Sequence, residues 1–142
     1  MLQKVSNLRH VIIGGNGFLG KKIVENLIAS DKKVIVIDRN INNSNNRNVK
    51  ELKCNIENIN DIFRINLSKN DVVHHLASNL IIPNKPRFNR YQYFFETTVK
   101  GTHNILETMK KSNCNKMVFW STDMVYGIYQ QKIINENNKT QP

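Results

Sequence analysis

The sequence predicts an α/β fold built on a doubly wound parallel sheet, with helices covering both faces of the sheet. Apolar runs expected as strands alternate five times with helical or polar segments along the 142 residues. The run Val34-Ile35-Val36-Ile37 is unbroken, as is typical of a parallel strand buried on both sides. The chain shows no internal repeat and is long enough for one domain with one core. We expect right-handed crossovers between the strands.

A glycine-rich turn joins the first expected strand, 10–14, to the first expected helix, 18–30. The stretch reads Val11-Ile12-Ile13-Gly14-Gly15-Asn16-Gly17-Phe18-Leu19-Gly20 and fits two patterns, Gly15-x-Gly17-x-x-Gly20 and Gly14-x-x-Gly17-x-x-Gly20. A Cβ at these positions would block the turn, the approach of a phosphate or the packing of helix on strand. Backbone N–H groups in such a turn can face a pyrophosphate. For the motif taken alone, an ordinary turn between strand and helix is the alternative.

The apolar spacing predicts the remaining elements. They are strands over 33–38, 49–54, 71–77 and 116–121, helices over 57–67 and 91–112, and loops over 39–48 and 78–90. The helix side chains expected to pack inward are Leu19, Ile23, Val24, Leu27 and Ile28; Ile59, Ile62, Phe63 and Leu67; and Phe94, Phe95, Val99, Thr102, Ile105, Leu106 and Met109. We interpret the Asn-rich loop 39–48 as a solvated connector rather than a binding element.

Polar or small residues follow every expected strand. They are Gly15–Gly17, Asp38, Asn55, Ser78 and Ser121-Thr122. Ligands of parallel sheets bind beyond the carboxyl ends of the strands, so these residues are expected to meet at one site. Asp38 also lies at about the distance from the glycines at which an acid binds ribose hydroxyls. The sequence therefore predicts a dinucleotide site.

The composition bears on other classes of function. The net charge of +10 raises nucleic-acid binding as an alternative, but the basic residues are dispersed and accompany no nucleic-acid-binding motif, so we expect no such partner. No apolar run could cross a bilayer and no secretion signal precedes the first strand, which predicts a cytoplasmic protein without membrane contact. Cys54 and Cys114 have no metal-ligand spacing, so buried thiols and no metal site are expected.

Five segments, in order, carry a resemblance to a known family. They are Gly14-Gly15-Asn16-Gly17-Phe18-Leu19-Gly20, Asp38, His75-Leu76-Ala77, Val99-Lys100-Gly101-Thr102-His103-Asn104-Ile105-Leu106-Glu107 and Ser121-Thr122-Asp123-Met124-Val125-Tyr126-Gly127. The chain resembles the extended short-chain dehydrogenase/reductases of the NAD-dependent epimerase/dehydratase type. The resemblance implies that residues 1–142 form an incomplete NAD(P)-binding Rossmann domain, truncated after about five strands. It also implies a nucleotide-sugar-like substrate, and it leaves a homodimer open for a full-length protein.

The resemblance also implies roles for individual residues. The pyrophosphate would be held by Gly14 and by the backbone of Asn16, Gly17, Phe18 and Leu19. The adenine would be flanked by Asn55 and Ile56. The cofactor would be contacted near its nicotinamide end by Leu76, Ala77, Ser78 and Ser121. Asp38 would bind the adenosine ribose, which favours NAD over NADP, although Arg39 beside it weakens that preference. Thr122 would be the catalytic residue that hydrogen-bonds the reacting sugar oxygen. A threonine that merely caps the next turn is the alternative for Thr122.

One family feature does not occur within the 142 residues. Family members carry a Tyr-x-x-x-Lys pair in which the tyrosine transfers the proton, whereas Gln130 and Ile133 stand four residues after Tyr126 and Tyr129. We therefore expect no turnover by these 142 residues alone. Two hypotheses follow: an enzyme fragment whose C-terminal substrate domain is absent, which we favour, and a non-catalytic NAD(P)-binding sensor or partner subunit. The substrate and the reaction are not specified by these residues.

Overall fold

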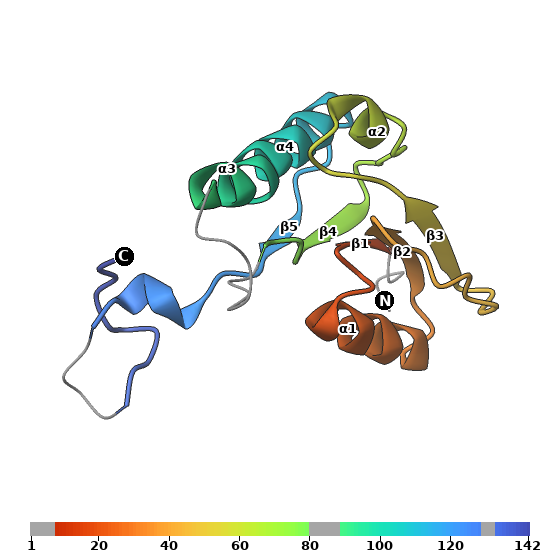
Figure 1. The fold of residues 1–142 in the computed structure, drawn as a ribbon. Helices are drawn as coiled ribbons and strands as arrows, with labels where there is room; N and C mark the ends of the chain where they lie inside the picture. Colours follow the sequence, from red (N-terminus) through yellow and green to blue (C-terminus); the bar gives the residue numbers. More distant parts are fainter. Residues whose placement is uncertain (1–7, 80–88, 129–132) are drawn as a thin grey trace.

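A five-stranded parallel sheet in the order β3-β2-β1-β4-β5 forms the centre of the protein (Figure 1). The computed structural model describes residues 8–79, 89–128 and 133–142. Its strands are β1 Arg9–Ile13, β2 Lys33–Asp38, β3 Val49–Lys53, β4 Asp71–His75 and β5 Met117–Phe119. Its helices are α1 Phe18–Ala29, α2 Ile59–Phe63, α3 Arg90–Phe94, the π-helix η1 Phe95–Gly101, α4 Thr102–Lys111 and the 3₁₀ helix η2 Asp123–Tyr126. The predicted α/β class and parallel sheet are confirmed.

Helices cover both faces of the sheet (Figure 1). Ile12, Val34 and Val36 pack against α1 on one face. The other face forms the larger core, in which strand residues such as Val11 and Val73 pack with side chains of α2 and α4. Because β1 and β2 are covered on both faces, their uninterrupted Val and Ile side chains are buried, as the sequence predicts.

The long helix expected over 91–112 is continuous in direction but changes its hydrogen-bonding pattern in the middle. Residues 95–101 form a π-helix between α3 and α4. Each π turn holds more residues than an α turn, so the inward face shifts relative to a regular 3.6-residue period. Thr97 and Gly101 are buried. The prediction that Phe95, Val99 and Leu106 pack inward is wrong, because 37%, 54% and 47% of their surfaces are exposed.

The helix after β3 is shorter than predicted. Only Ile59–Phe63 are helical, with the side chain of Asn58 accepting a hydrogen bond from the N–H of Asn60 at the start. Ile62 and Leu67 are buried as expected, but Phe63 is 44% exposed. The Phe63 ring instead lies under the ammonium group of Lys111, which is 3.5 Å from the ring centroid. This cation–π contact stabilises the ring at the protein surface, where the short helix places it.

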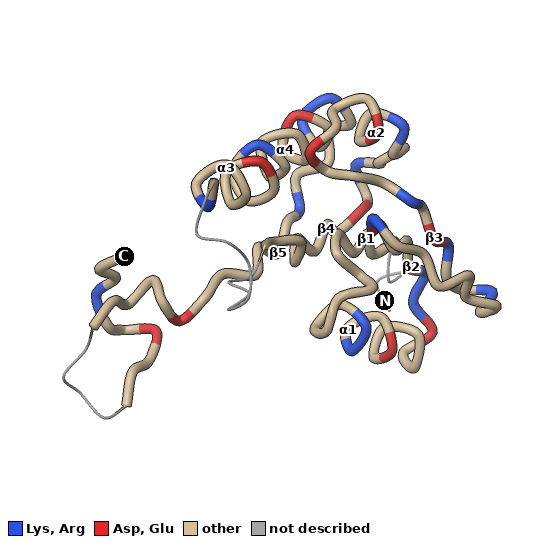
Figure 2. Tube along the Cα trace, viewed as in Figure 1, with Lys and Arg blue, Asp and Glu red and all other residues tan. Residues whose placement is uncertain are grey.

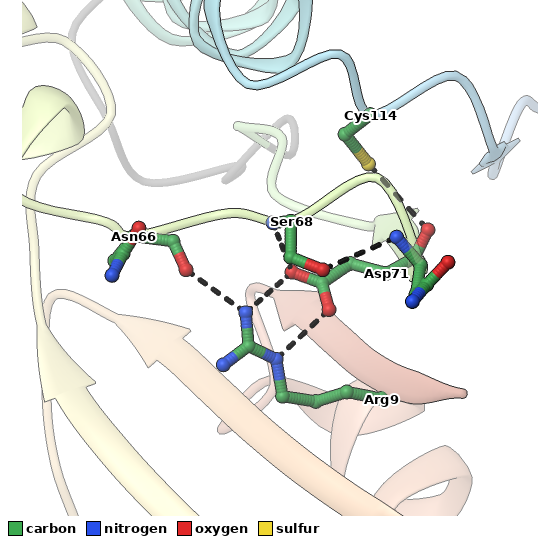
Figure 3. Close-up of polar contacts among 6 residues, drawn as sticks. Arg9, Asn66, Ser68, Asp71 and Cys114 are labelled. Carbon is green, nitrogen blue, oxygen red and sulfur yellow. Dashed lines mark hydrogen bonds and ion pairs between the residues drawn. The ribbon is translucent and has the colours of Figure 1, made fainter. Parts of the chain in front are cut away.

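The amino ends of β1 and β4 are joined by a bidentate ion pair (Figure 3). Arg9 Nε and Nη2 donate to the two carboxylate oxygens of Asp71 at 2.9 and 2.6 Å. Asp71 is 1% exposed, and it also accepts from the N–H of Ser68 at 2.8 Å. Arg9 Nη2 donates in addition to the carbonyl of Asn66 at 2.9 Å. The two central strands are therefore held in register at the end opposite the predicted site.

Charged residues are distributed over the whole fold (Figure 2). Lys and Arg lie along α1, β3 and the helices of the opposite layer, with Asp and Glu between them. In the described part of the chain, no helix combines the length and the apolar character that crossing a bilayer requires.

Candidate functional site

A cavity of about 440 Å³ lies beyond the carboxyl ends of the central strands. Residues from the glycine turn, from the ends of β2, β3 and β4 and from η1 surround it. Its lining consists of Gly14, Asn16, Gly17, Lys21, Ile37, Asp38, Arg39, Asn40, Asn42, Cys54, Asn55, Ile56, Glu57, Leu76, Ala77, Ser78 and Thr97. This position is the one at which parallel sheets bind their ligands.

The glycine turn leaves room that any other residue would fill. Gly14 has φ +82°, and a Cβ there would stand 2.9 Å from the backbone nitrogen of Ala77. A Cβ on Gly20 would stand 2.7 Å from the Cα of Gly15, so α1 and β1 could not approach as closely. The close approach of three backbone segments explains both glycines. It also brings the start of α1 to the edge of the cavity.

The amino end of α1 carries no side-chain cap. Gly17 is the N-cap residue, in extended conformation, and it lines the cavity. The first N–H groups of a helix have no partner within the helix, and the helix dipole adds partial positive charge there. Lys21 lies one turn further on and also lines the cavity. This end of the cavity is therefore suited to an anion such as a pyrophosphate.

The carboxylate of Asp38 lies at the end of β2 and lines the cavity. Its Oδ2 accepts from the backbone N–H of Asn16, and its Oδ1 accepts from the backbone N–H of Asn40, each at 3.0 Å. The N–H of Asn16 is thus directed at this carboxylate, whereas the resemblance implies that it holds the pyrophosphate. Asp38 joins the glycine turn to the loop that follows β2 and keeps two further lone-pair positions for a ligand.

The opposite wall is built by the segment after β3. Asn55 Oδ1 accepts from the N–H of Glu57 at 3.1 Å, so the amide side chain closes a local turn. The carbonyl of Ile56 accepts from Asn104 Nδ2 at 2.8 Å. Thr97 Oγ1 donates to the carboxylate of Glu57. Residues of η1 and α4 therefore hold this wall in place.

Cys54 lies in the same wall and is 4% exposed. Burial raises the pKa of its thiol to about 11. The thiol therefore stays protonated near neutral pH. Cys54 also packs within the larger core of the fold.

The cavity brings together most of the residues that the sequence nominates for cofactor binding. These are Gly14, Asn16, Gly17, Asp38, Arg39, Asn55, Ile56, Leu76, Ala77 and Ser78. Phe18 and Leu19 stand beside it at the start of α1, with 94% and 52% of their surfaces exposed. The prediction that Leu19 packs inward is therefore wrong. Ser121 and Thr122 follow β5 and are not among the lining residues.

Thr122 caps the next turn in this structure. Its Oγ1 accepts from the N–H of Met124 at 3.3 Å and donates to Asp123 at 3.1 Å, at the start of η2. The side chain is exposed. The catalytic role that the resemblance implies for Thr122 stays a prediction.

Sequence reasoning missed several lining residues. Asn40 and Asn42 belong to the loop 39–48, which the sequence indicates as a solvated connector, and the structure places both in the lining of the cavity. The low-complexity composition hid them, although the short distance from Asp38 was a usable signal. Glu57 reaches the cavity from the turn after β3, and Thr97 reaches it from η1. No sequence pattern marked either position.

Comparison with known proteins gives one consistent result. A putative UDP-glucose 4-epimerase of Methanocaldococcus jannaschii is 33% identical over 136 residues, which cover 93% of this chain and 44% of that protein. A dTDP-D-glucose 4,6-dehydratase of Dictyostelium discoideum is 35% identical over 144 residues, covering 92% of this chain and 32% of that protein. The chain thus spans less than half the length of these relatives.

The same fold occurs in solved structures. The UDP-glucose 4-epimerase of Thermus thermophilus, in complex with NAD, has a TM-score of 0.78 at 25% identity. The match covers 94% of this chain and 44% of that one. Residues 10–142 also match the sequence model of the NAD dependent epimerase/dehydratase family. On this match the chain, with its glycine turn, its Asp38 carboxylate and its Rossmann-like sheet, belongs to the NAD-dependent epimerase/dehydratase family.

Proposed function

We propose that this chain is the dinucleotide-binding part of an NAD-dependent oxidoreductase that acts on a nucleotide sugar, in an epimerase or dehydratase reaction. One observation carries the proposal: the uncapped start of α1 and the carboxylate of Asp38 line the same cavity. The first suits a pyrophosphate and the second suits the hydroxyls of a ribose. The relatives named above act on UDP-glucose or dTDP-D-glucose by their names, which supports the substrate class.

The residues in and beside the cavity support NAD as the ligand. N–H groups at Phe18 and Leu19 would hold the pyrophosphate, since the N–H of Gly17 donates to the carbonyl of Gly14 at 3.1 Å. Asp38 would accept from the adenosine ribose. The adenine would lie along Asn55 and Ile56, while the strand end Leu76, Ala77 and Ser78 would contact the nicotinamide side. A carboxylate repels the 2′-phosphate of NADP, so NAD is the preferred cofactor even with Arg39 adjacent.

Bound NAD would supply reversible hydride acceptance at a sugar carbon. The chain itself would position the sugar through the hydroxyl of Thr122, which can both donate and accept a hydrogen bond. The 142 residues contain no Tyr-x-x-x-Lys pair. We therefore propose that this stretch by itself binds the cofactor without turning it over.

Isothermal titration of the 142-residue protein with NAD and NADP tests the proposal. Asp38→Asn removes the negative charge, and we expect it to weaken NAD binding roughly tenfold, the worth of one hydrogen bond to a charged group. Glu25→Gln is the matched control, because Glu25 is an exposed carboxylate on α1 that pairs with Lys22 and does not line the cavity. No uptake of either dinucleotide by folded protein would refute the proposed function.

A non-catalytic NAD(P)-binding sensor or partner subunit is the second candidate. Both candidates predict binding without turnover for these residues. Reading the coding sequence beyond Pro142 separates them, because an in-frame Tyr-x-x-x-Lys supports the enzyme and an immediate stop codon supports the module. Formation of NADH from NAD and UDP-glucose by the 142-residue protein would contradict the absence of turnover.

A further inference from the structure

The side chain of Asn16 bridges the glycine turn and the loop after β2. Asn16 Nδ2 donates to the carbonyl of Asn40 at 2.6 Å, and Asn16 Oδ1 accepts from Asn42 Nδ2 at 2.8 Å. The backbone N–H of the same residue donates to Asp38 at 3.0 Å. One residue between glycines therefore makes three hydrogen bonds to the segment 38–42.

Glu51 on β3 holds the same loop from its other side. Its Oε2 accepts from the backbone N–H of Asn42 at 2.6 Å and from that of Asn43 at 2.9 Å. Hydrogen bonds to a carboxylate are about twice as strong as bonds between neutral groups. Asn43 has φ +54°, a left-handed conformation that asparagine tolerates. The loop is thus held between Asn16 and Glu51.

This arrangement determines how Asp38 presents its carboxylate. Each of its oxygens accepts one backbone N–H, from Asn16 and from Asn40. A carboxylate has about four lone-pair positions, so about two remain for a ligand. Two acceptor positions match the two O–H donors of an unmodified ribose. A 2′-phosphate offers negative charge in place of one of these donors.

We propose that Asn16 and Glu51 are positioning residues that fix the loop after β2 and thereby set the preference of the Asp38 site for a ribose with free 2′- and 3′-hydroxyls. The inference rests on the proposed function and deepens it. Asp38 accepts the hydrogen bonds of the ribose hydroxyls, while Asn16 and Glu51 fix the orientation of its carboxylate. A loop released from either residue would let the carboxylate rotate and let Arg39 turn toward a 2′-phosphate.

The first test compares the binding of NAD and NADP to Asn16→Ala. Alanine removes both side-chain hydrogen bonds and keeps the backbone N–H that Asp38 accepts. We expect NAD affinity to fall about tenfold and NADP affinity to change less than about threefold, so the preference for NAD narrows. Glu51→Gln should shift the preference in the same direction. The matched control is Asn48→Ala. Asn48 belongs to the same loop, its Nδ2 donates to Asp31 Oδ1 at 2.7 Å, and it does not line the cavity.

The second test needs no ligand. Hydrogen exchange of the Asn42 and Asn43 amides, measured by NMR on the free protein, should accelerate at least about fivefold in Asn16→Ala and in Glu51→Gln, since each variant loses about 1 kcal/mol or more of hydrogen bonding. Unchanged exchange, or an unchanged ratio of NAD to NADP affinity in Asn16→Ala, overturns the inference while leaving the proposed function intact. If the parent protein takes up neither dinucleotide, the proposed function fails, and the preference assigned to Asn16 and Glu51 fails with it. In that case, accelerated amide exchange would still confirm that Asn16 and Glu51 hold the loop after β2 in place.

Discussion

The ion pair between Arg9 and Asp71 is asymmetric in its exposure. The side chain of Asp71 is 1% exposed, whereas that of Arg9 is 34% exposed. Removing one partner of a buried pair costs more when the charge left behind cannot reach water. Arg9 can turn toward solvent, but Asp71 cannot. The two partners should therefore contribute differently to stability.

We predict that Arg9→Met lowers the free energy of unfolding by about 3–5 kcal/mol, because it leaves a buried carboxylate without its cation. Asp71→Asn should cost about 1–2 kcal/mol, since Asn keeps an acceptor for the N–H of Ser68. Urea unfolding of the two variants measures both values. Lys100→Met is the control, because its pair with Glu96 lies at the surface and should contribute less than about 1 kcal/mol. Equal losses for the Arg9 and Asp71 variants would contradict the asymmetry.

At the scale of elements, the π-helix η1 sets how the long helix meets the wall of the cavity. It turns Thr97 toward Glu57 and places Gly101 against the side chain of Ile56. A Cβ on Gly101 would stand 2.7 Å from Ile56 Cδ1 and 2.8 Å from Cγ1. π segments are rare and often lie at functional sites. Here the segment allows the helix backbone to approach the residues expected beside the adenine.

This contact predicts that the effect of Gly101→Ala on the free energy of unfolding changes sign when the Ile56 side chain is truncated. Gly101→Ala should destabilise the parent by about 1–2 kcal/mol through overpacking, although alanine is the better helix former. In an Ile56→Ala background the same substitution should stabilise the protein by up to about 1 kcal/mol, because the crowding atoms are gone. Thermal or urea unfolding of the four proteins provides the cycle. Destabilisation of the same size in both backgrounds would show that Ile56 is not the obstacle.

At the scale of the whole molecule, two half-buried histidines and one buried histidine link the stability of the sheet to pH. His10 on β1 and His74 on β4 lie with Nδ1 and Nε2 3.1 Å apart, so one ring donates and the other accepts. Burial lowers the pKa of both, and Lys32 lowers that of His10 further. Burial also lowers the pKa of His75, which is 2% exposed. The folded state therefore favours the neutral form of all three rings.

The free energy of unfolding should fall as the pH drops below about 6.5, the unperturbed value, because the unfolded chain then binds more protons than the folded one. The contribution of these histidines is fully present above that pH and is lost below it. Each histidine can add a slope of at most about 1.4 kcal/mol per pH unit. Urea unfolding between about pH 8 and pH 5 measures the slope, and His74→Asn should reduce it. Stability that rises as the solution is acidified through this range would contradict the assignment.

The strands and the glycine turn could be predicted because their causes are local. An unbroken Val and Ile run favours a buried parallel strand wherever it lies, and β2 has the predicted bounds, 33–38. The glycine turn needs positive φ at Gly14 and bare backbone at Gly20, which only glycine supplies. Asp38 could be identified because its distance from the turn is set by the length of one helix and one strand.

The sequence by itself determined the family, the order of strands and helices, and the glycines and acid at the edge of the sheet. Tertiary structure decided which helix faces are buried, because a π turn rotates Phe95 and Val99 outward. It also decided which residues surround the cavity, since Asn42, Glu57 and Thr97 meet only once separate strands and helices have packed. Local patterns report the conformation of one segment, whereas a site depends on the register between segments, and packing alone sets that register.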